Sequence, residues 1–570
     1  MLFSAALAGL MLGACSSSDD LGGGNTPANK DGNGYVAVTI NLPSQTTTRA
    51  GSENDQFKDG LASEYDVKNA TLILFGGSDE SSATFSQAYA LNTAPWTKQN
   101  PDDGNITTVS QTITKEVSAP EGKAYALVVL NHNGLFSLDG TSLKFKGESS
   151  NFTGSFSDFL KKSSITENTT LYKDGFFMAN APLADKVGGS TEPNGVAVNT
   201  LVNLDGKICE TEAEARAKAA NIYVERAVAK VTLVPGSATT VDGTSVAFKV
   251  AGWNIDRTNK TTYLVRSTED FTAKWATLAT NKTGVAEPYR FVGANAVAAG
   301  LYRTYFAKDV NYDTDAKDQL SDNREFSEAT GSDKPQYCFE NTFDVAHQND
   351  NQTTRVLIKA ELNSGNDFYV INGDENNIYT KDEAVKEIKA NFLAEYENWI
   401  KQNVETPTTV GESNVEVTIS DEAGNVELTN LALTGVTYKT GGETTLPADA
   451  KSNTMTRLGT IELYKGGVSY YAVRIKHFGD DLTPWKDGEA PTPEVGKIYP
   501  SDNQDGNYLG RYGVLRNNWY ELEVSGVKGL GSATVPEVTT VTDDELKSYI
   551  AVKINVLSWA KRTQSTILGQ

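Results

Sequence analysis

Hydrophobic and polar residues alternate in several short segments, and this alternation is the main structural signal in the chain. Residues 35–42, YVAVTINL, are the first such segment. Its apolar face consists of Val36, Val38, Ile40 and Leu42. A period of two is typical of a β-strand with one buried face, and Pro43 ends the segment. We therefore predict a half-buried strand near the start of the chain.

A second segment of the same kind lies near the other end of the chain, at residues 549–556, YIAVKINV. Its apolar face consists of Ile550, Val552, Ile554 and Val556. Tyr, Ala, Val, Ile and Asn recur in the same order in the two segments. Strands can resemble one another by chance, because few residue types suit them. The alternative is that both strands fit the same groove.

Between these ends the pattern predicts mostly strands and turns. Residues 124–130 and 176–180 are expected as buried strands, and residues 210–221 as a short helix. The strongest helical pattern runs from Asp382 to Gln402, with apolar residues at spacings of three and four. This stripe consists of Val385, Ile388, Phe392, Tyr396 and Trp399. We expect it to pack inward, as part of a helical insertion.

Composition limits the function classes. A chain of 570 residues is long enough for two or more cores. Lys+Arg 51 against Asp+Glu 73 gives a net charge of −22. A negative net charge repels phosphate backbones and anionic lipid headgroups, so nucleic acid is not an expected partner.

The first residues have the pattern of an export signal. Residues 2–14 form an apolar run that is too short to span a bilayer but suits a signal peptide. The run ends in Leu12-Gly13-Ala14 before Cys15, which has the form of a lipobox: cleavage before Cys15, followed by acylation of its thiol. No second hydrophobic stretch has membrane length. We expect a lipid-anchored precursor outside the cytoplasm, with the membrane contacted only through the lipid.

A cleavable segment follows the first strand. Residues 44–56, SQTTTRAGSENDQ, are polar, and Arg49 is their only basic residue. An exposed arginine in such a segment is where a trypsin-like protease would cut. Cleavage between Arg49 and Ala50 would release the first strand and leave a hydrophobic slot. The C-terminal strand of another copy could fill the slot by strand addition, and repeated head-to-tail contacts of this kind make a filament.

Candidate chemistry is sparse. Cys209 and Cys338 are far apart, and either a disulfide or two buried free thiols is consistent with an exported protein. The three histidines form no metal-binding motif, and neither a GxSxG elbow nor a phosphate-binding loop occurs. Carboxylates are numerous enough for a glycosidase-like pair, but nothing else indicates an active site. We predict no catalytic residue, metal or cofactor.

Four short motifs, taken together, resemble the major (shaft) subunits of type V fimbriae of Bacteroidales, in particular that of the short (minor, Mfa-type) fimbria in the fimbrillin superfamily. The first motif is the lipobox followed by a strand and Thr48-Arg49-Ala50-Gly51. The other three are VERAVAKV at 224–231, YYAVRIKHF at 470–478 and YGVLRNNWYEL at 512–522. They occur in the order and at the approximate spacing of that superfamily.

The resemblance implies a mainly all-β fold with two transthyretin-like β-sandwiches, a helical insertion in the second, and exchangeable terminal strands. The implied segments are a signal peptide (1–14), a lipidated propeptide (15–49), an N-terminal sandwich (50–224), a C-terminal sandwich (225–530) with the insertion near 382–402, a linker (531–547) and a donor strand (548–570). Implied partners are further copies of the chain, fimbrial anchor and tip subunits, and an arginine-specific maturation protease.

Two functions from different classes remain. The first is a structural fimbrial subunit at the cell surface, which polymerises by protease-triggered strand exchange and supports adhesion and biofilm formation. The second is a monomeric or tip-located surface lipoprotein that binds a glycan or a host protein. A tip adhesin must accept a donor strand but need not offer one. The matched terminal strands, with Arg49 after the first, therefore favour the polymer.

Overall fold

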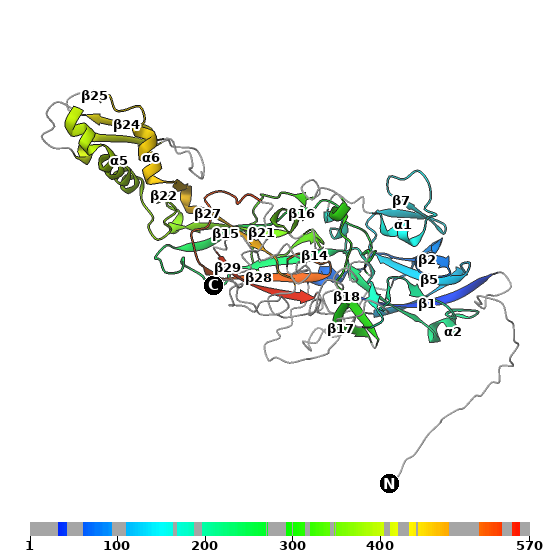
Figure 1. Cartoon of the computed structure of the whole chain (residues 1–570). Coiled ribbons are helices and arrows are strands. Elements are labelled where there is room, and N and C mark those ends of the chain that lie inside the picture. Colours follow the sequence, from blue (N-terminus) through cyan, green and yellow to red (C-terminus); the bar gives the residue numbers. More distant parts are fainter. Residues whose placement is uncertain are drawn as a thin grey trace, which may run out of the picture.

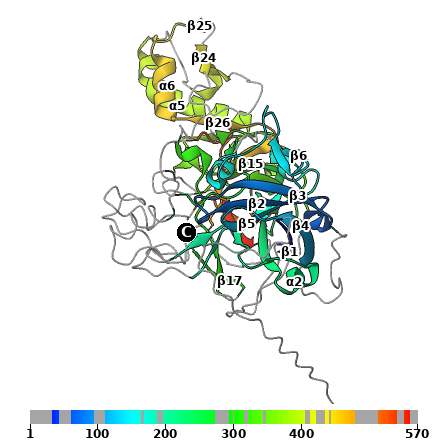
Figure 2. The same ribbon diagram turned by 90° about the vertical axis from the view of Figure 1, so that its right-hand side faces the viewer.

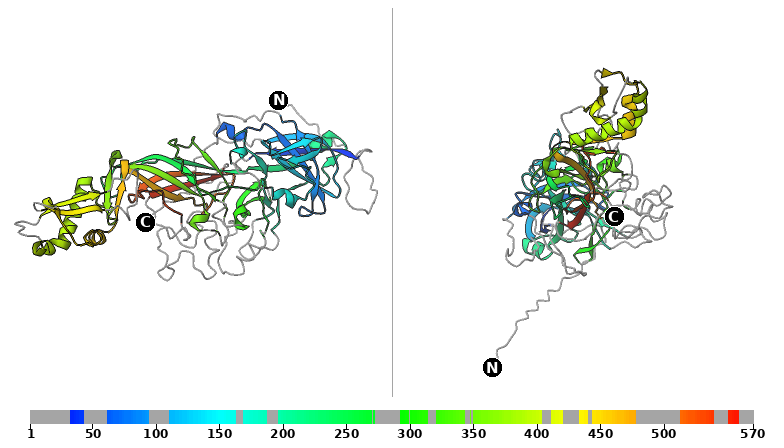
Figure 3. Two further views of the ribbon diagram at one scale, coloured as in Figure 1. Left: turned by 90° about the horizontal axis from the view of Figure 1, so that it is seen from above. Right: turned by 90° about the vertical axis from the view of Figure 1, so that its left-hand side faces the viewer.

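The alternating segments form β-strands, and the protein is mainly β in a computed structural model of its chain (Figure 1). The structure describes residues 32–42, 61–93, 110–162, 168–186, 196–269, 271, 292–298, 300–313, 320–342, 347, 349–403, 411–419, 433–439, 443–477, 512–538 and 550–558. Figures 1 and 3 show an elongated molecule in which three bodies follow one another. We call them the N-terminal sandwich, the C-terminal sandwich and the lobe.

The N-terminal sandwich consists of two layers of strands around one core. One layer holds β1 (Asn33–Asn41), β4 (Ser110–Ser118), β12 (Ile208–Cys209) and the start of β13 (Ala220–Arg226). The other holds β2 (Ala70–Gly77), β3 (Thr84–Leu91), β5 (Lys123–Leu130), β8 (Met178–Asn180), β11 (Val202–Asn203) and the end of β13. Strand β13 passes between the layers, because residues 220–223 pair with β1 and residues 224–226 pair with β8.

Smaller elements cover this sandwich. They are η1 (Ala62–Tyr65), the hairpin β6 (Phe136–Asp139) and β7 (Ser142–Phe145), α1 (Phe156–Leu160), η2 (Asn168–Leu171) and α2 (Glu212–Ala217). Helix α2 is shorter than the predicted helix at 210–221, because the chain enters β13 at Ala220 and there pairs with β1. Strand β8 likewise begins at Met178, two residues after the predicted start.

The C-terminal sandwich also has two layers. One is β20 (Gln336–Phe339), β14 (Val228–Val234), β28 (Asn518–Val527) and β29 (Ile550–Ser558), in that order. The other is β15 (Phe248–Asp256), β21 (Arg355–Leu362) and β27 (Val468–Arg474). Buried residues of both layers, among them Tyr520, Leu522, Trp253 and Ile358, form one core. Strands β14 and β28, far apart in the sequence, pair in parallel.

The lobe is an insertion between β21 and β27, joined to the C-terminal sandwich by the paired strands β22 (Phe368–Ile371) and β26 (Ile461–Tyr464). It contains α5 (Lys381–Asn403), α6 (Ala450–Leu458) and the sheet of β23 (Val415–Ile419), β24 (Leu433–Lys439) and β25 (Glu443–Thr444). The predicted helix 382–402 is therefore confirmed as α5. Its buried stripe follows an i+4 row: Ala384, Ile388, Phe392, Tyr396 and Ile400. Val385 and Trp399, predicted to be inward, are only partly buried beside this row.

Small elements complete the described chain. A four-stranded sheet at the side of the junction joins β9 (Leu183–Ala184) and β10 (Val198–Asn199) to β17 (Val292–Ala298) and β18 (Leu301–Thr304). The pair β16 (Thr258–Asn259) and β19 (Leu320–Ser321) lies in the C-terminal half. Short 3-10 turns are η4 (Val310–Asp313), η5 (Asp350–Gln352), η6 (Asn363–Gly365), η7 (Glu412–Asn414) and η8 (Lys465–Gly467).

The chain passes from one sandwich to the other at Ala227, between β13 and β14. Beside this crossing the carboxylate of Glu64, in η1, is fully buried and lies 2.7 Å from the ammonium of Lys230. The Tyr337 hydroxyl donates a hydrogen bond of 2.7 Å to the same carboxylate. Arg226 donates from Nε and Nη2 to the backbone carbonyl of Glu64, at 3.1 and 2.8 Å. Burial lowers the pKa of Lys230, while the Glu64 carboxylate acts in the opposite direction.

A second buried ionic cluster fixes the other side of the crossing. Arg266 lies 2.6 Å from Glu225, and Arg516 lies 2.9 Å from Glu340. Arg516 also donates to the backbone carbonyl of Leu264, at 3.0 Å. These contacts tie segments of both sandwiches together, so we expect the junction to behave as a rigid joint.

Replacing Lys230 with Met would leave the Glu64 carboxylate buried without its cationic partner. Breaking a buried pair in this way costs about 3–5 kcal/mol. The free energy of unfolding, measured by urea denaturation, should fall by that amount. The matched control is Arg216→Ala, which removes the exposed pair between Arg216 and Glu212 and should cost under about 0.5 kcal/mol. Equal losses in the two variants would contradict a structural role for the junction cluster.

Candidate functional site

The first strand, β1, lies in the interior of its layer and has neighbours along both edges. Along one edge it pairs antiparallel with β4 over its whole length, from Asn33 opposite Ser118 to Asn41 opposite Ser110. Along the other edge residues 38–41 pair in parallel with residues 220–223 of β13. Residues 35 and 36 pair with β12. Among the described strands, β4 pairs only with β1, so β1 alone connects β4 to the layer.

The inward face of β1 is the one predicted from its period of two. Val36, Val38, Ile40 and Leu42 are each at most 2% exposed and belong to the core of the N-terminal sandwich. Full burial of such side chains contributes about 1.5–3 kcal/mol each, so the four contribute roughly 6–12 kcal/mol before ordering costs. Removing β1 would expose a slot lined by this core.

The opposite face of β1 is also partly covered, although the alternation predicted a half-buried strand. Ala37 is fully buried, packed with Cys209 and with Ala215 of α2. Thr39 is half-exposed, and its hydroxyl lies 2.8 Å from that of Thr112. Helix α2 is distant in the sequence, which is why local periodicity did not predict this cover.

The start of the strand fits closely against β12. Gly34 lies so near β12 that a Cβ there would stand 2.7 Å from Cγ2 of Ile208 and 3.1 Å from the carbonyl oxygen of Cys209. Such contacts are shorter than van der Waals separation, so a residue larger than glycine would displace β12. The slot is therefore narrow at this end.

The C-terminal strand, β29, occupies a different kind of position. It pairs antiparallel with β28, from Ile550 opposite Val527 to Ser558 opposite Asn518. It stands at the end of its sheet and has this one neighbour among the described strands. The strand predicted at 549–556 is thus present, but its side chains lie outside what the structure describes. Strand β29 is therefore paired along one edge, whereas β1 is paired along both edges.

The predicted lipidation residue Cys15 and the cleavage residues Arg49 and Ala50 lie outside the described residues. The described residues do fix both ends of the segment that carries Arg49. Strand β1 ends at Asn41, which pairs with Tyr223 of β13. Three residues further along β13, Arg226 donates to the backbone carbonyl of Glu64 in η1 and so holds η1 in place. Three strand residues span about 10 Å. The intervening residues 43–60 could extend to about 60 Å, so the connection is much longer than the gap along β13 requires.

The remaining predicted candidates have structural surroundings. Cys209 and Cys338 are free and buried, which decides between the two alternatives left open for them. Burial raises the pKa of Cys338 to about 12. The Nδ1 atom of His477, also buried, lies 2.7 Å from the hydroxyl of Tyr520. No group of three potential metal-ligating side chains occurs among the described residues, and none of the helices described there is long and apolar enough to cross a membrane.

Comparisons with known proteins point to one family over a short part of the chain. Residues 498–565 match the family described as "Major fimbrial subunit protein type IV, Fimbrillin, C-terminal". The matched range includes β28 and β29. No curated protein matches the chain significantly.

Several solved structures are similar in outline. A fimbrilin from Porphyromonas gingivalis is 12% identical, with a TM-score of 0.33, over 93% of this chain and 99% of that one. A tip fimbrial protein from the same species is 10% identical, with a TM-score of 0.29, over 92% and 100%. A candidate cell adhesion protein from Parabacteroides distasonis is 9% identical, with a TM-score of 0.37, over 93% and 98%. TM-scores this low carry no inference about function.

Proposed function

We propose that this chain is the shaft subunit of a cell-surface fimbria, which polymerises when the C-terminal strand of one copy replaces β1 in the next. The observation that carries the proposal is the interior position of β1, a segment joined to the rest of the subunit through Arg49. The family match over residues 498–565 supports a fimbrial subunit independently, because it rests on the opposite end of the chain.

Residue-by-residue comparison of the two strands supports the same direction and register for the incoming strand. Ala551 would stand at the place of Ala37, where α2 leaves room only for a small side chain. Lys553 would stand at the place of Thr39, which is half-exposed and lets a long charged side chain reach water. Ile554 would take the place of Ile40 in the core. The other apolar residues of the period-two pattern, Ile550, Val552 and Val556, would take the places of Val36, Val38 and Leu42.

The match ends at the narrow part of the slot beside Gly34. Ser548 would stand at the place of Gly34, and its Cβ would meet Ile208 at 2.7 Å. In this register the donor therefore enters the slot at Tyr549 and follows β1 from there to Val556. The ladder with β4 accordingly begins near Glu116, the partner of Tyr35.

The C-terminal strand is more stable in the interior slot of another copy than at the edge of its own sheet, and this difference favours the exchange. On β28 the C-terminal strand forms one ladder. In the vacated slot it would form ladders with β4 and with β13, and would cover the core that β1 covered. Each additional backbone hydrogen bond contributes about 0.5–1.5 kcal/mol net. The exchanged state is therefore favoured once β1 has been released, and its dissociation is slow.

Maturation in this proposal begins from a precursor lipidated at Cys15 and anchored to the outer membrane. An arginine-specific protease cuts between Arg49 and Ala50, and the lipid leaves with β1. The mature subunit consists of the two sandwiches with the lobe, a linker of residues 531–547 and a donor strand in residues 548–570. Anchor and tip subunits cap the homopolymer, and the fibre supports adhesion and biofilm formation.

A tip-located adhesin is the second candidate function. It would accept a donor strand in the same slot but would not offer one. The edge position of β29 and its match to β1 favour the shaft subunit, because they give the chain a strand to donate.

Treating the protein, produced without residues 1–15, with an arginine-specific protease should yield multimers that resist SDS without boiling. The reason is the interior position of the donor strand, which makes dissociation slow. Unboiled samples on a denaturing gel should show a ladder of multimers, and N-terminal sequencing should identify Ala50.

Two controls accompany this experiment. Arg49→Ala should remain uncut and monomeric, and deletion of residues 549–570 should allow cutting but prevent the ladder. Clean cutting at Arg49 that leaves full-length chains monomeric would contradict the shaft-subunit proposal and favour the tip adhesin.

The register can be tested with Ala551→Leu, because a leucine at the place of Ala37 would overpack the contact with α2. Overpacking of this kind costs about 1–3 kcal/mol. Multimers of this variant should dissociate in SDS at a lower temperature than those of the parent. Lys553→Leu is the matched control and should not lower that temperature, because Thr39 is half-exposed. The reverse ranking of the two variants would show that the strand enters in another register.

A further inference from the structure

The lobe is the largest feature that the proposed strand exchange does not use. It lies at the end of the molecule opposite the N-terminal sandwich, as Figures 1 and 3 show from two directions. It has small cores of its own, one around Ile388 and Leu458 and another around Phe392 and Tyr396. Neither sandwich needs these residues for its own core.

We call residues 529–536 the root of the C-terminal arm. The base of the lobe holds this root. The Tyr464 hydroxyl donates to the carbonyl of Gly531 at 2.9 Å, and the amide of Leu530 donates to Glu375 at 2.9 Å. Tyr464 ends β26, and Glu375 follows β22. The arm that would carry the donor strand therefore leaves the body of the subunit at the lobe.

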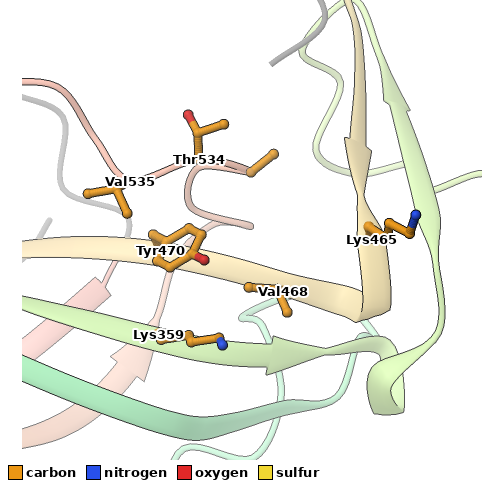
Figure 4. A pocket seen from close by; sticks show the side chains of 7 residues that line it. Lys359, Lys465, Val468, Tyr470, Thr534 and Val535 are labelled. Atoms are coloured by element: carbon orange, nitrogen blue, oxygen red, sulfur yellow. The ribbon is translucent and has the colours of Figure 1, made fainter. Parts of the chain in front are cut away.

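Other contacts fix the root against the C-terminal sandwich. Tyr470 in β27 and Ser532 exchange two backbone hydrogen bonds, at 2.8 and 3.0 Å. Figure 4 shows Thr534 and Val535 above Tyr470, with Lys359 on the strand below it and Lys465 further to the right. Further on, Arg355 donates to the carbonyl of Pro536 at 2.9 Å. Pro536 is thus the last residue of the root that an observed contact holds.

The slot, in contrast, opens at the far end of the N-terminal sandwich. Strand β13 runs toward the junction and ends at Arg226, and β1 is parallel to it. The start of β1 therefore points away from the junction. Figure 2 looks along the molecule onto this end and shows β1, β4 and α2 together there. We call the surface around the start of β1, with the turn of residues 118–123 and Lys207, the end face.

The length of the arm limits how far apart the root and the end face of the next copy can be. Residues 537–548 lie between Pro536 and Tyr549, the first slot residue of the donor strand. At about 3.3–3.6 Å per residue they reach about 45 Å at most. Helix α5 alone, at 1.5 Å per residue, is about 35 Å long, and the lobe extends the molecule beyond the root (Figure 3). The next copy has too little room to sit beyond the lobe without touching it.

We infer that the lobe, described at residues 367–403, 411–419, 433–439 and 443–464, is a docking element that packs against the end face of the next copy of this chain. This inference rests on the proposed strand exchange, from which it takes the position of the donor strand. It assigns the lobe to the contact between successive subunits. The partner is a second copy of the chain, because the arm that sets the distance is the chain's own.

Cross-linking of matured polymers tests this inference. Subunits with natural isotopes and subunits labelled with ¹⁵N are mixed, cut with the arginine-specific protease and treated with a short amine-reactive cross-linker. Cross-linked peptides are then identified by mass spectrometry. Mixed-isotope links should join the lobe residues Lys386 or Lys401 of one copy to Lys123 or Lys207 of another. Lys207 and Lys218 are close within one subunit. Links between these two lysines serve as a control that Lys207 reacts with the cross-linker.

The outcomes separate the two proposals. Multimers in which Lys386 and Lys401 give no mixed-isotope links to the end face would overturn the docking role while leaving strand exchange intact. Links from the lobe to Lys161, which lies near the junction, would overturn it as well. Absence of multimers would instead contradict the proposed strand exchange, and the docking role that depends on it.

Discussion

The N-terminal sandwich depends on an interior strand that comes from the first residues of the described chain. Strand β1 lies between β4 on one side and β13 and β12 on the other, and its inward side chains are part of the core. A strand at the edge of a sheet can leave and expose one row of backbone groups. When an interior strand leaves, it exposes two rows of unpaired backbone groups and opens a gap in the core. Both carry a large free-energy cost in water. The sandwich is therefore incomplete without an occupant of this slot.

The junction determines what would remain fixed if β1 were released. Glu64 follows the residues that contain Arg49, and it is held by Lys230, Tyr337 and Arg226 at the crossing between the sandwiches. The N-terminal part of a mature chain would thus stay attached at the middle of the molecule. Continuous passage from β13 into β14 links the strand that borders the slot directly to the C-terminal sandwich. In a fibre, load on the donor strand would be carried through this path into the body of the subunit.

Local pattern predicted the strands well, because alternation or a short apolar run within one segment is enough to identify a strand. The segments at 35–42 and 124–130 are strands β1 and β5, and the helix at 382–402 is α5. Contacts between distant segments were not predictable in this way. The cover of Ala37 by α2, the parallel pairing of β14 with β28 and the burial of Lys230 all depend on residues far away in the sequence. Cys15 and Arg49 remain predictions from sequence.

The most direct measurement is the reactivity of Cys209, which pairs with Tyr35 and packs against Ala37 of β1, compared with Cys338 in the other core. A maleimide is added to the protein lacking residues 1–15, before and after cleavage at Arg49, and to a form that also lacks residues 549–570. Neither thiol should react before cleavage. After cleavage and release of β1, Cys209 of the truncated form should react while Cys338 stays protected, and the full-length form should become protected again as multimers form. If Cys209 stays as unreactive as Cys338 after the first strand has been released, β1 does not cover this slot and the proposed strand exchange is wrong.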